Sequence, residues 1–148
     1  MKQAGFTLQE RALRALLRWW SGLFLLALIA FAVFPREIIF RLNAIGHHIF
    51  GVNALPMDLP SEHFWQVLAV ALLAILTWMS FMAQYDIRRY LVYVPVIILS
   101  KLASTIGFLI AFFTAGGHFA YLAGAIVDGL IFLITWFYYH RTGVSRSF

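Results

Sequence analysis

The sequence predicts an all-α integral membrane protein, a four-helix bundle, from its composition, its apolar stretches and the placement of its basic residues. Hydrophobic residues make up 63% of the 148-residue chain and charged residues only 11%. A soluble domain of this size would leave too much apolar surface in water, whereas a bilayer solvates that surface directly. Four apolar stretches are each near or above the roughly 17 to 25 residues that a helix needs to cross a bilayer. We therefore expect one membrane domain, 1–148, with spans at approximately 19–34, 64–83, 91–115 and 119–139.

The first apolar stretch is short, but good helix formers precede it from Leu8 onward. Arg11, Arg14 and Arg18 recur there at spacings of three and four, as expected for arginines that extend into the headgroup zone from one helix. We expect a single helix that Pro35 ends. A cleaved signal peptide is the alternative, because residues 30–32 (Ala-Phe-Ala) imitate a cleavage site behind a basic leader. We expect the segment to be retained.

The basic residues predict the orientation of the spans, because segments rich in Lys and Arg stay in the cytoplasm. Of the 11 Lys and Arg residues, eight lie in the N-terminal segment, the connection between the second and third spans, and the C-terminal segment. Only Arg36 and Arg41 lie in the connections on the other side, and Lys101 lies within the third span. Both termini are therefore predicted to be cytoplasmic, and the expected location is a bacterial inner membrane.

The long connection 35–63, on the predicted outer side, has an apolar surface of its own. Isoleucine, leucine and phenylalanine recur through its first half, which favours a helix lying in the membrane interface. Gly51 and Asn53 are candidates to end that helix, and Ser61 is a candidate N-cap for the second span.

Lys101 and Asp128 are the most informative residues, because each lies well inside an apolar span. An ionisable group there costs about 2.5 to 3.5 kcal/mol on insertion scales, so it is expected to face protein or water. Lys101 lies about 15 Å along its helix from Leu91, and Asp128 about 13 Å from Phe119. The two spans form a tight antiparallel hairpin, which brings both residues to within about a turn of one depth.

Three interpretations of this pair remain open from the sequence. Lys101 and Asp128 can form an internal ion pair that fixes helix packing. They can also bind a proton, an ion or a polar ligand near the membrane midplane. Docking against another subunit is the third.

Small and hydroxyl residues accompany both charges on their helix faces. Ser104 and Thr105 follow Lys101 by three and four residues, and Tyr121 and Thr135 lie seven residues before and after Asp128. These six residues form the predicted intramembrane polar site. In the second span, polar residues also fall near one face, which predicts a polar path through the bundle: Gln66, Thr77, Ser80 and Gln84.

Four histidines fall on the predicted outer side and are weak candidates for a metal or haem site: His47, His48, His63 and His118. His47 and His48 are adjacent, so on a helix they diverge by about 100° and are poorly placed to bind one ion together. We predict no cofactor, with a histidine-bound metal or haem as the alternative.

The remaining residues argue against most other functions. The chain has no cysteine, which excludes disulfides, thiolate metal sites and cysteine nucleophiles. The formal charge of +5 is scattered over helix ends rather than gathered into a stripe, so no nucleic-acid partner is expected. Neither a zinc-protease motif nor a phosphate loop nor a nucleophile elbow occurs, so the sequence leans away from an enzyme.

Three functions are consistent with this pattern. The first is a non-catalytic accessory, assembly or scaffold subunit of a larger membrane complex, with lipids and other membrane subunits, or further copies of itself, as partners. The second is a binding or transport protein that uses the Lys101 and Asp128 site. The third is an outer-face redox protein built on the histidines.

Overall fold

The computed structural model describes residues 6–51 and 64–142, and these residues form five helices. The helices are α1 (Leu8–Val33), α2 (Pro35–Phe50), α3 (Phe64–Tyr85), α4 (Tyr93–Thr114) and α5 (Phe119–Arg141). Four of them, α1, α3, α4 and α5, are long and apolar enough to cross a membrane. The predicted all-α membrane architecture is confirmed at this level. The expected N-cap Ser61, together with Asn53 and His63, lies outside the described residues.

Helix α1 begins well before its apolar stretch, as predicted from its helix formers. The Thr7 side chain accepts a hydrogen bond from the Glu10 backbone N–H, and the Glu10 carboxylate accepts one from the Thr7 N–H at 2.7 Å. This capping box satisfies two backbone donors that a helix start leaves open. The helix ends at Val33, and Pro35 occupies the first turn of α2, where its missing N–H costs nothing.

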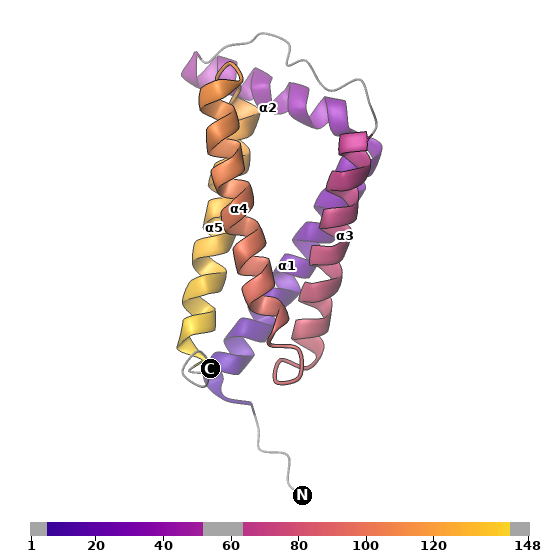
Figure 1. Cartoon of the computed structure of the whole chain (residues 1–148), viewed down its shortest axis with the longest axis vertical. Helices are drawn as coiled ribbons and strands as arrows, with labels where there is room; N and C mark the ends of the chain where they lie inside the picture. The colour runs from indigo at the N-terminus through magenta and orange to yellow at the C-terminus, as the bar shows by residue number, and fades with distance from the viewer. Residues whose placement is uncertain (1–5, 52–63, 143–148) are drawn as a thin grey trace, which may run out of the picture.

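Helix α2 lies across one end of the four long helices (Figure 1). It ends at Gly51, whose φ of 63° is the left-handed conformation that glycine adopts without strain, so the expected role of Gly51 is confirmed. The start of α1, the α3–α4 connection and the end of α5 lie together at the opposite end (Figure 1). We call these two ends of the bundle the α2 end and the terminal end.

The long helices pack as two pairs, α1 with α3 and α4 with α5, and the two pairs meet closely only in the terminal half (Figure 1). The buried core lies in that half: Leu13, Leu17, Phe24, Leu76, Ala83, Ile87, Val94, Ile97 and Ile131. No residue of α1 after Phe24 is buried, and none of α3 from Gln66 to the residue before Leu76. Apart from Ala125 on α5, the apolar core therefore ends near the level of Phe24.

Polar contacts hold the terminal end together. The Arg14 guanidinium donates to the backbone carbonyl of Gln84 at 2.8 Å, which ties α1 to the end of α3. Arg88, in the α3–α4 connection, forms a 2.9 Å ion pair with Glu10, and the Glu10 carboxylate raises the pKa of the Arg88 guanidinium. Arg14 and Arg88, two of the basic residues that predicted the orientation, therefore also connect the helices at the terminal end.

Candidate functional site

Lys101 and Asp128 form an ion pair inside the α4–α5 hairpin. The Lys101 Nζ donates to Asp128 Oδ1 at 2.8 Å, and the two side chains are only 8% and 13% exposed. The hairpin geometry explains the contact, because two antiparallel helices joined by a short connection carry the residues at similar depth. Of the three interpretations that the sequence left open, the structure thus supports the internal ion pair.

The hydroxyls next to Lys101 complete this pair, each in a different way. Ser104 Oγ donates to Asp128 Oδ2, the carboxylate oxygen that Lys101 does not bind. Thr105 Oγ1 donates to the backbone carbonyl of Lys101 at 2.7 Å, a carbonyl that Ser104 Oγ also contacts at 3.2 Å. The Thr105 methyl group faces Gly129 on α5. Because Gly129 has no side chain, the two backbones can approach closely beside the ion pair.

Helix α1 also contacts the ion pair. The Lys101 Nζ lies 4.8 Å from the centre of the Phe24 ring, a distance typical of a cation–π interaction. Phe24 is 2% exposed and belongs to the buried core. The ammonium group is therefore enclosed by a carboxylate from α5 and an aromatic face from α1.

Two predicted members of the polar site take part in other contacts. Thr135 Oγ1 accepts from the Trp20 indole N–H at 2.9 Å and donates to the carbonyl of Ile131 at 2.6 Å. It therefore joins α5 to α1 nearer the terminal end. The ring of Tyr121 contacts His118, close to the start of α5.

The four polar residues of α3 do not contact the ion pair, and two of them bind α1. Gln66 Nε2 donates to the backbone carbonyl of Ala32 at 3.1 Å, and Gln84 Nε2 donates to Ser21 Oγ at 3.2 Å. Thr77 Oγ1 bonds its own helix, at the carbonyl of Leu73. Ser80 is buried, and its hydroxyl has no partner among the described residues. Gln66 and Gln84 therefore make two separate contacts between α1 and α3, and the four residues do not form one continuous polar path.

The described histidines do not gather into a metal site. His47 and His48 are exposed on α2, and His118 precedes α5 with its Nδ1 atom buried and without a hydrogen-bond partner in the described chain. Within residues 6–51 and 64–142, no group of three or more His, Cys, Asp or Glu residues is arranged to hold a metal ion. A site that includes His63 stays a prediction, which absorbance spectra and metal analysis of the purified protein would test.

The contact between α2 and α5 was not predicted from the sequence. The Asn43 side-chain oxygen accepts from the backbone N–H of Ala120 at 2.9 Å, which caps the first turn of α5 from another helix. Gly46, one turn later on the same face of α2, is buried where the Phe119 side chain crosses the helix. The only sequence signal for this contact was the three-residue spacing of Asn43 and Gly46, which places them on one face of a helix.

The chemistry of the central pair follows from these contacts. Both Asp128 oxygens are engaged, one by an ammonium and the other by a hydroxyl, and the Lys101 ammonium also lies against the Phe24 ring. Such an arrangement offsets part of the cost of burying the two charges in an apolar environment. It also places two exchangeable protons, on Lys101 and Ser104, at one carboxylate.

Comparison of the chain with protein-family models, with curated proteins and with solved structures gave no match. The described residues support a multi-pass helical membrane protein with a buried Lys101–Asp128 ion pair.

Proposed function

We propose that the protein is a non-catalytic accessory or scaffold subunit of a larger membrane complex, in which the Lys101–Asp128 pair fixes the α4–α5 hairpin. The observation that carries this proposal is that the two intramembrane charges pair with each other. Lys101 binds Asp128, and Ser104 occupies the second carboxylate oxygen. A buried pair that is saturated in this way supports a structural role.

The surface of the spans supports the same proposal. Large aromatic side chains are exposed on all four long helices: Trp19, Trp78, Phe81, Phe113, Trp136 and Phe137. Such side chains suit contact with lipid or with apolar helices of other subunits. The distribution of Lys and Arg supports insertion into a bacterial inner membrane with the terminal end in the cytoplasm.

Affinity purification from native membranes in a mild detergent tests the subunit proposal. We expect defined foreign membrane proteins to copurify with the tagged chain in fixed stoichiometry. An unrelated four-span protein with the same tag controls for detergent carry-over. If the chain elutes alone, or as a symmetric oligomer of itself, the proposal is contradicted.

A binding or transport role is the second candidate, and one observation favours it. The ion pair lies where the buried core ends, because no residue of α4 beyond Lys101 is buried and none of α1 beyond Phe24. Asp128 lies nine residues from the start of α5, and Lys101 lies 13 residues from the end of α4. An ion or proton that entered from the α2 end would therefore reach Asp128 before Lys101.

Proteoliposomes separate this role from the first. With a pH-sensitive dye inside the vesicles, a transporter gives a proton or cation flux that Asp128→Asn abolishes, whereas Ser100→Ala leaves the flux unchanged. If the protein is a subunit without transport activity, vesicles with the wild-type protein or with either variant should show the same leak as empty vesicles.

A further inference from the structure

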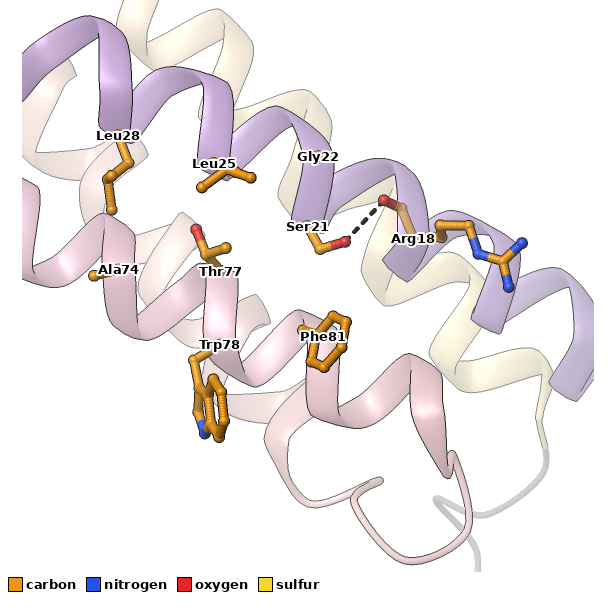
Figure 2. Close-up of a pocket in the computed structure, with 9 residues that line it drawn as sticks. All are labelled: Arg18, Ser21, Gly22, Leu25, Leu28, Ala74, Thr77, Trp78 and Phe81. Atoms are coloured by element: carbon orange, nitrogen blue, oxygen red, sulfur yellow. Dashed lines mark hydrogen bonds between the residues drawn. The ribbon is translucent and has the colours of Figure 1, made fainter.

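A groove of about 420 Å³ runs along the outside of the bundle between α1 and α3 (Figure 2). Gly22, Leu25 and Leu28 line it from α1, and Ala74, Thr77 and Phe81 line it from α3. In Figure 2 the side chains of Leu25 and Leu28 point from α1 toward α3. Arg18 lies at one end of the groove, ten residues or about 15 Å from Leu28.

The groove is apolar because its hydroxyl groups are already engaged. Thr77 Oγ1 donates to the Leu73 carbonyl at 2.7 Å, and Ser21 Oγ donates to the Arg18 carbonyl at 2.9 Å. Gly22 leaves the middle of the groove open, since no atom lies within 4 Å of the point where a Cβ would stand. The walls therefore accept a hydrocarbon chain and offer no polar contact to it.

Arg18 gives the groove a charged end. Its side chain is exposed and extends past the lining residues toward the amino-terminal end of α1 (Figure 2). Its guanidinium has no ion-pair or hydrogen-bond partner in the described part of the chain. At the end of a membrane span, an arginine in this position lies at headgroup depth, where it can bind phosphate through two parallel N–H groups.

We propose that the α1–α3 groove binds one acyl chain of an anionic phospholipid and that Arg18 holds the phosphate of its headgroup. The combination of an apolar groove with a single cation at its end matches this amphipathic anion. A second copy of the chain fits less well, because the carboxylates of the described residues are already engaged or lie elsewhere. Glu10 and Asp128 are in ion pairs, and Glu37 lies at the α2 end. The Asp86 carboxylate accepts hydrogen bonds from the backbone N–H groups of Arg88 and Arg89.

Native mass spectrometry of the full-length protein in mild detergent tests the proposal with phosphatidylglycerol and phosphatidylethanolamine of identical acyl chains. We expect phosphatidylglycerol to be retained in preference, and Arg18→Gln to weaken its retention about five-fold, the effect of one arginine at an anionic surface. Arg41→Gln, at an exposed arginine on α2, is the matched control and should leave retention unchanged. Glycerol phosphate, which has no acyl chains, should not compete.

Filling the groove is the second arm of this experiment. Gly22→Leu should reduce retention of both lipids, whereas Gly107→Leu, at an equally open glycine on α4, should not. Ala74→Leu fills the groove from α3 and replaces Gly22→Leu if that variant does not fold. Thermal unfolding without added lipid reports the folding of each variant.

Three results would overturn the proposal. Equal retention of the two lipids by the wild-type protein would show that Arg18 does not select the headgroup. Equal effects of Gly22→Leu and Gly107→Leu would show that the acyl chain does not occupy the groove. A change in oligomeric state on Gly22→Leu would assign the groove to a second copy of the chain.

Discussion

The Lys101 ammonium lies 4.8 Å from the centre of the Phe24 ring, so the ion pair of the α4–α5 hairpin also contacts α1. This contact occurs at the level where the buried core ends and the two helix pairs begin to separate. It therefore joins the two pairs at the last level where they pack closely. If this contact is energetically significant, the ion pair stabilises the packing of the two helix pairs against each other. If it is not, the ion pair stabilises the α4–α5 hairpin alone.

Removing one member of the ion pair should be much more damaging than removing both. Lys101→Met leaves the Asp128 carboxylate buried without its cation, and Asp128→Leu leaves the ammonium alone. Each single change is expected to destabilise the protein by about 3 kcal/mol. The double variant replaces the pair with apolar side chains and should recover most of that loss. Thermal unfolding of the purified proteins in detergent measures all three.

The double-mutant cycle makes this prediction specific to the pair. Recovery in the double variant requires a large coupling energy between Lys101 and Asp128. Leu99→Ala, at an exposed position of α4, is a control that should cost little. Additive losses in the cycle would contradict a pairwise interaction and would favour independent roles for the two charges.

The Ser104 hydroxyl should stabilise the protein only while Asp128 is present. It donates to the carboxylate oxygen that Lys101 leaves open, and hydrogen bonds to charged groups contribute about 1.5 to 3 kcal/mol. Ser104→Ala should therefore lower the apparent Tm of the wild-type protein, but not that of the Lys101→Met/Asp128→Leu variant. Ser100→Ala serves as the matched control on α4. An equal loss in both backgrounds would show that Ser104 acts through helix packing alone.

The Phe24 ring should contribute a cation–π interaction in addition to its packing. Phe24→Leu keeps an apolar side chain but removes the aromatic face, and the lost attraction to Lys101 is expected to be about 1 to 2 kcal/mol. In the Lys101→Met/Asp128→Leu background, Phe24→Leu should cost only its packing term. Apparent Tm values for the four proteins give the difference, and equal costs in both backgrounds would rule out a cation–π contribution.

Much of the fold was predictable because a membrane restricts the backbone to few solutions. A lipid environment requires every backbone polar group to be satisfied within the segment, so long apolar stretches predict helices directly. The continuous first helix, its end before Pro35 and the role of Gly51 followed from local rules for capping and chain breaking.

The contacts between helices were less predictable. The cost of burying a charge indicated that Lys101 and Asp128 would find partners, and a short hairpin placed them together. The partners of Trp20 and Phe24 depend on how α1 crosses the other helices, which no local pattern encodes. For the same reason, helical spacing grouped Tyr121 and Thr135 with Asp128, although their contacts lie elsewhere.

Docking of α2 onto α5 should depend on the small size of Gly46. A Cβ at Gly46 would lie 2.1 Å from the Cβ of Phe119, so Gly46→Ala requires the two helices to move apart. The Asn43 cap of α5 would be lost with this movement, and a cap contributes about 1 kcal/mol. Hydrogen exchange at the start of α5, read by mass spectrometry, should therefore accelerate in Gly46→Ala.

Two further variants separate the cap from the packing. Asn43→Ala should accelerate exchange at the start of α5 without displacing α2. Gly107→Ala adds the same methyl group to α4, where nothing lies within 4 Å, and should leave exchange unchanged. Unchanged exchange in both Gly46→Ala and Asn43→Ala would contradict the docking of α2 on α5.

The Trp20–Thr135 hydrogen bond should couple the two residues energetically, because losing only its acceptor leaves the Trp20 indole N–H unpaired. Thr135 is fully buried, so Thr135→Val, which is nearly isosteric, leaves the Trp20 indole N–H without its partner at an expected cost of about 1 to 3 kcal/mol. Thr135→Val combined with Trp20→Phe removes the unpaired donor, so the second change should cost less in the Thr135→Val background than in the wild-type protein. Apparent Tm values of the four proteins form the cycle, and Trp19→Phe, at the exposed neighbour, is the control for aromatic replacement. A zero coupling energy would mean that the 2.9 Å contact does not stabilise the junction of α1 and α5, and that apolar packing alone holds the two helices together.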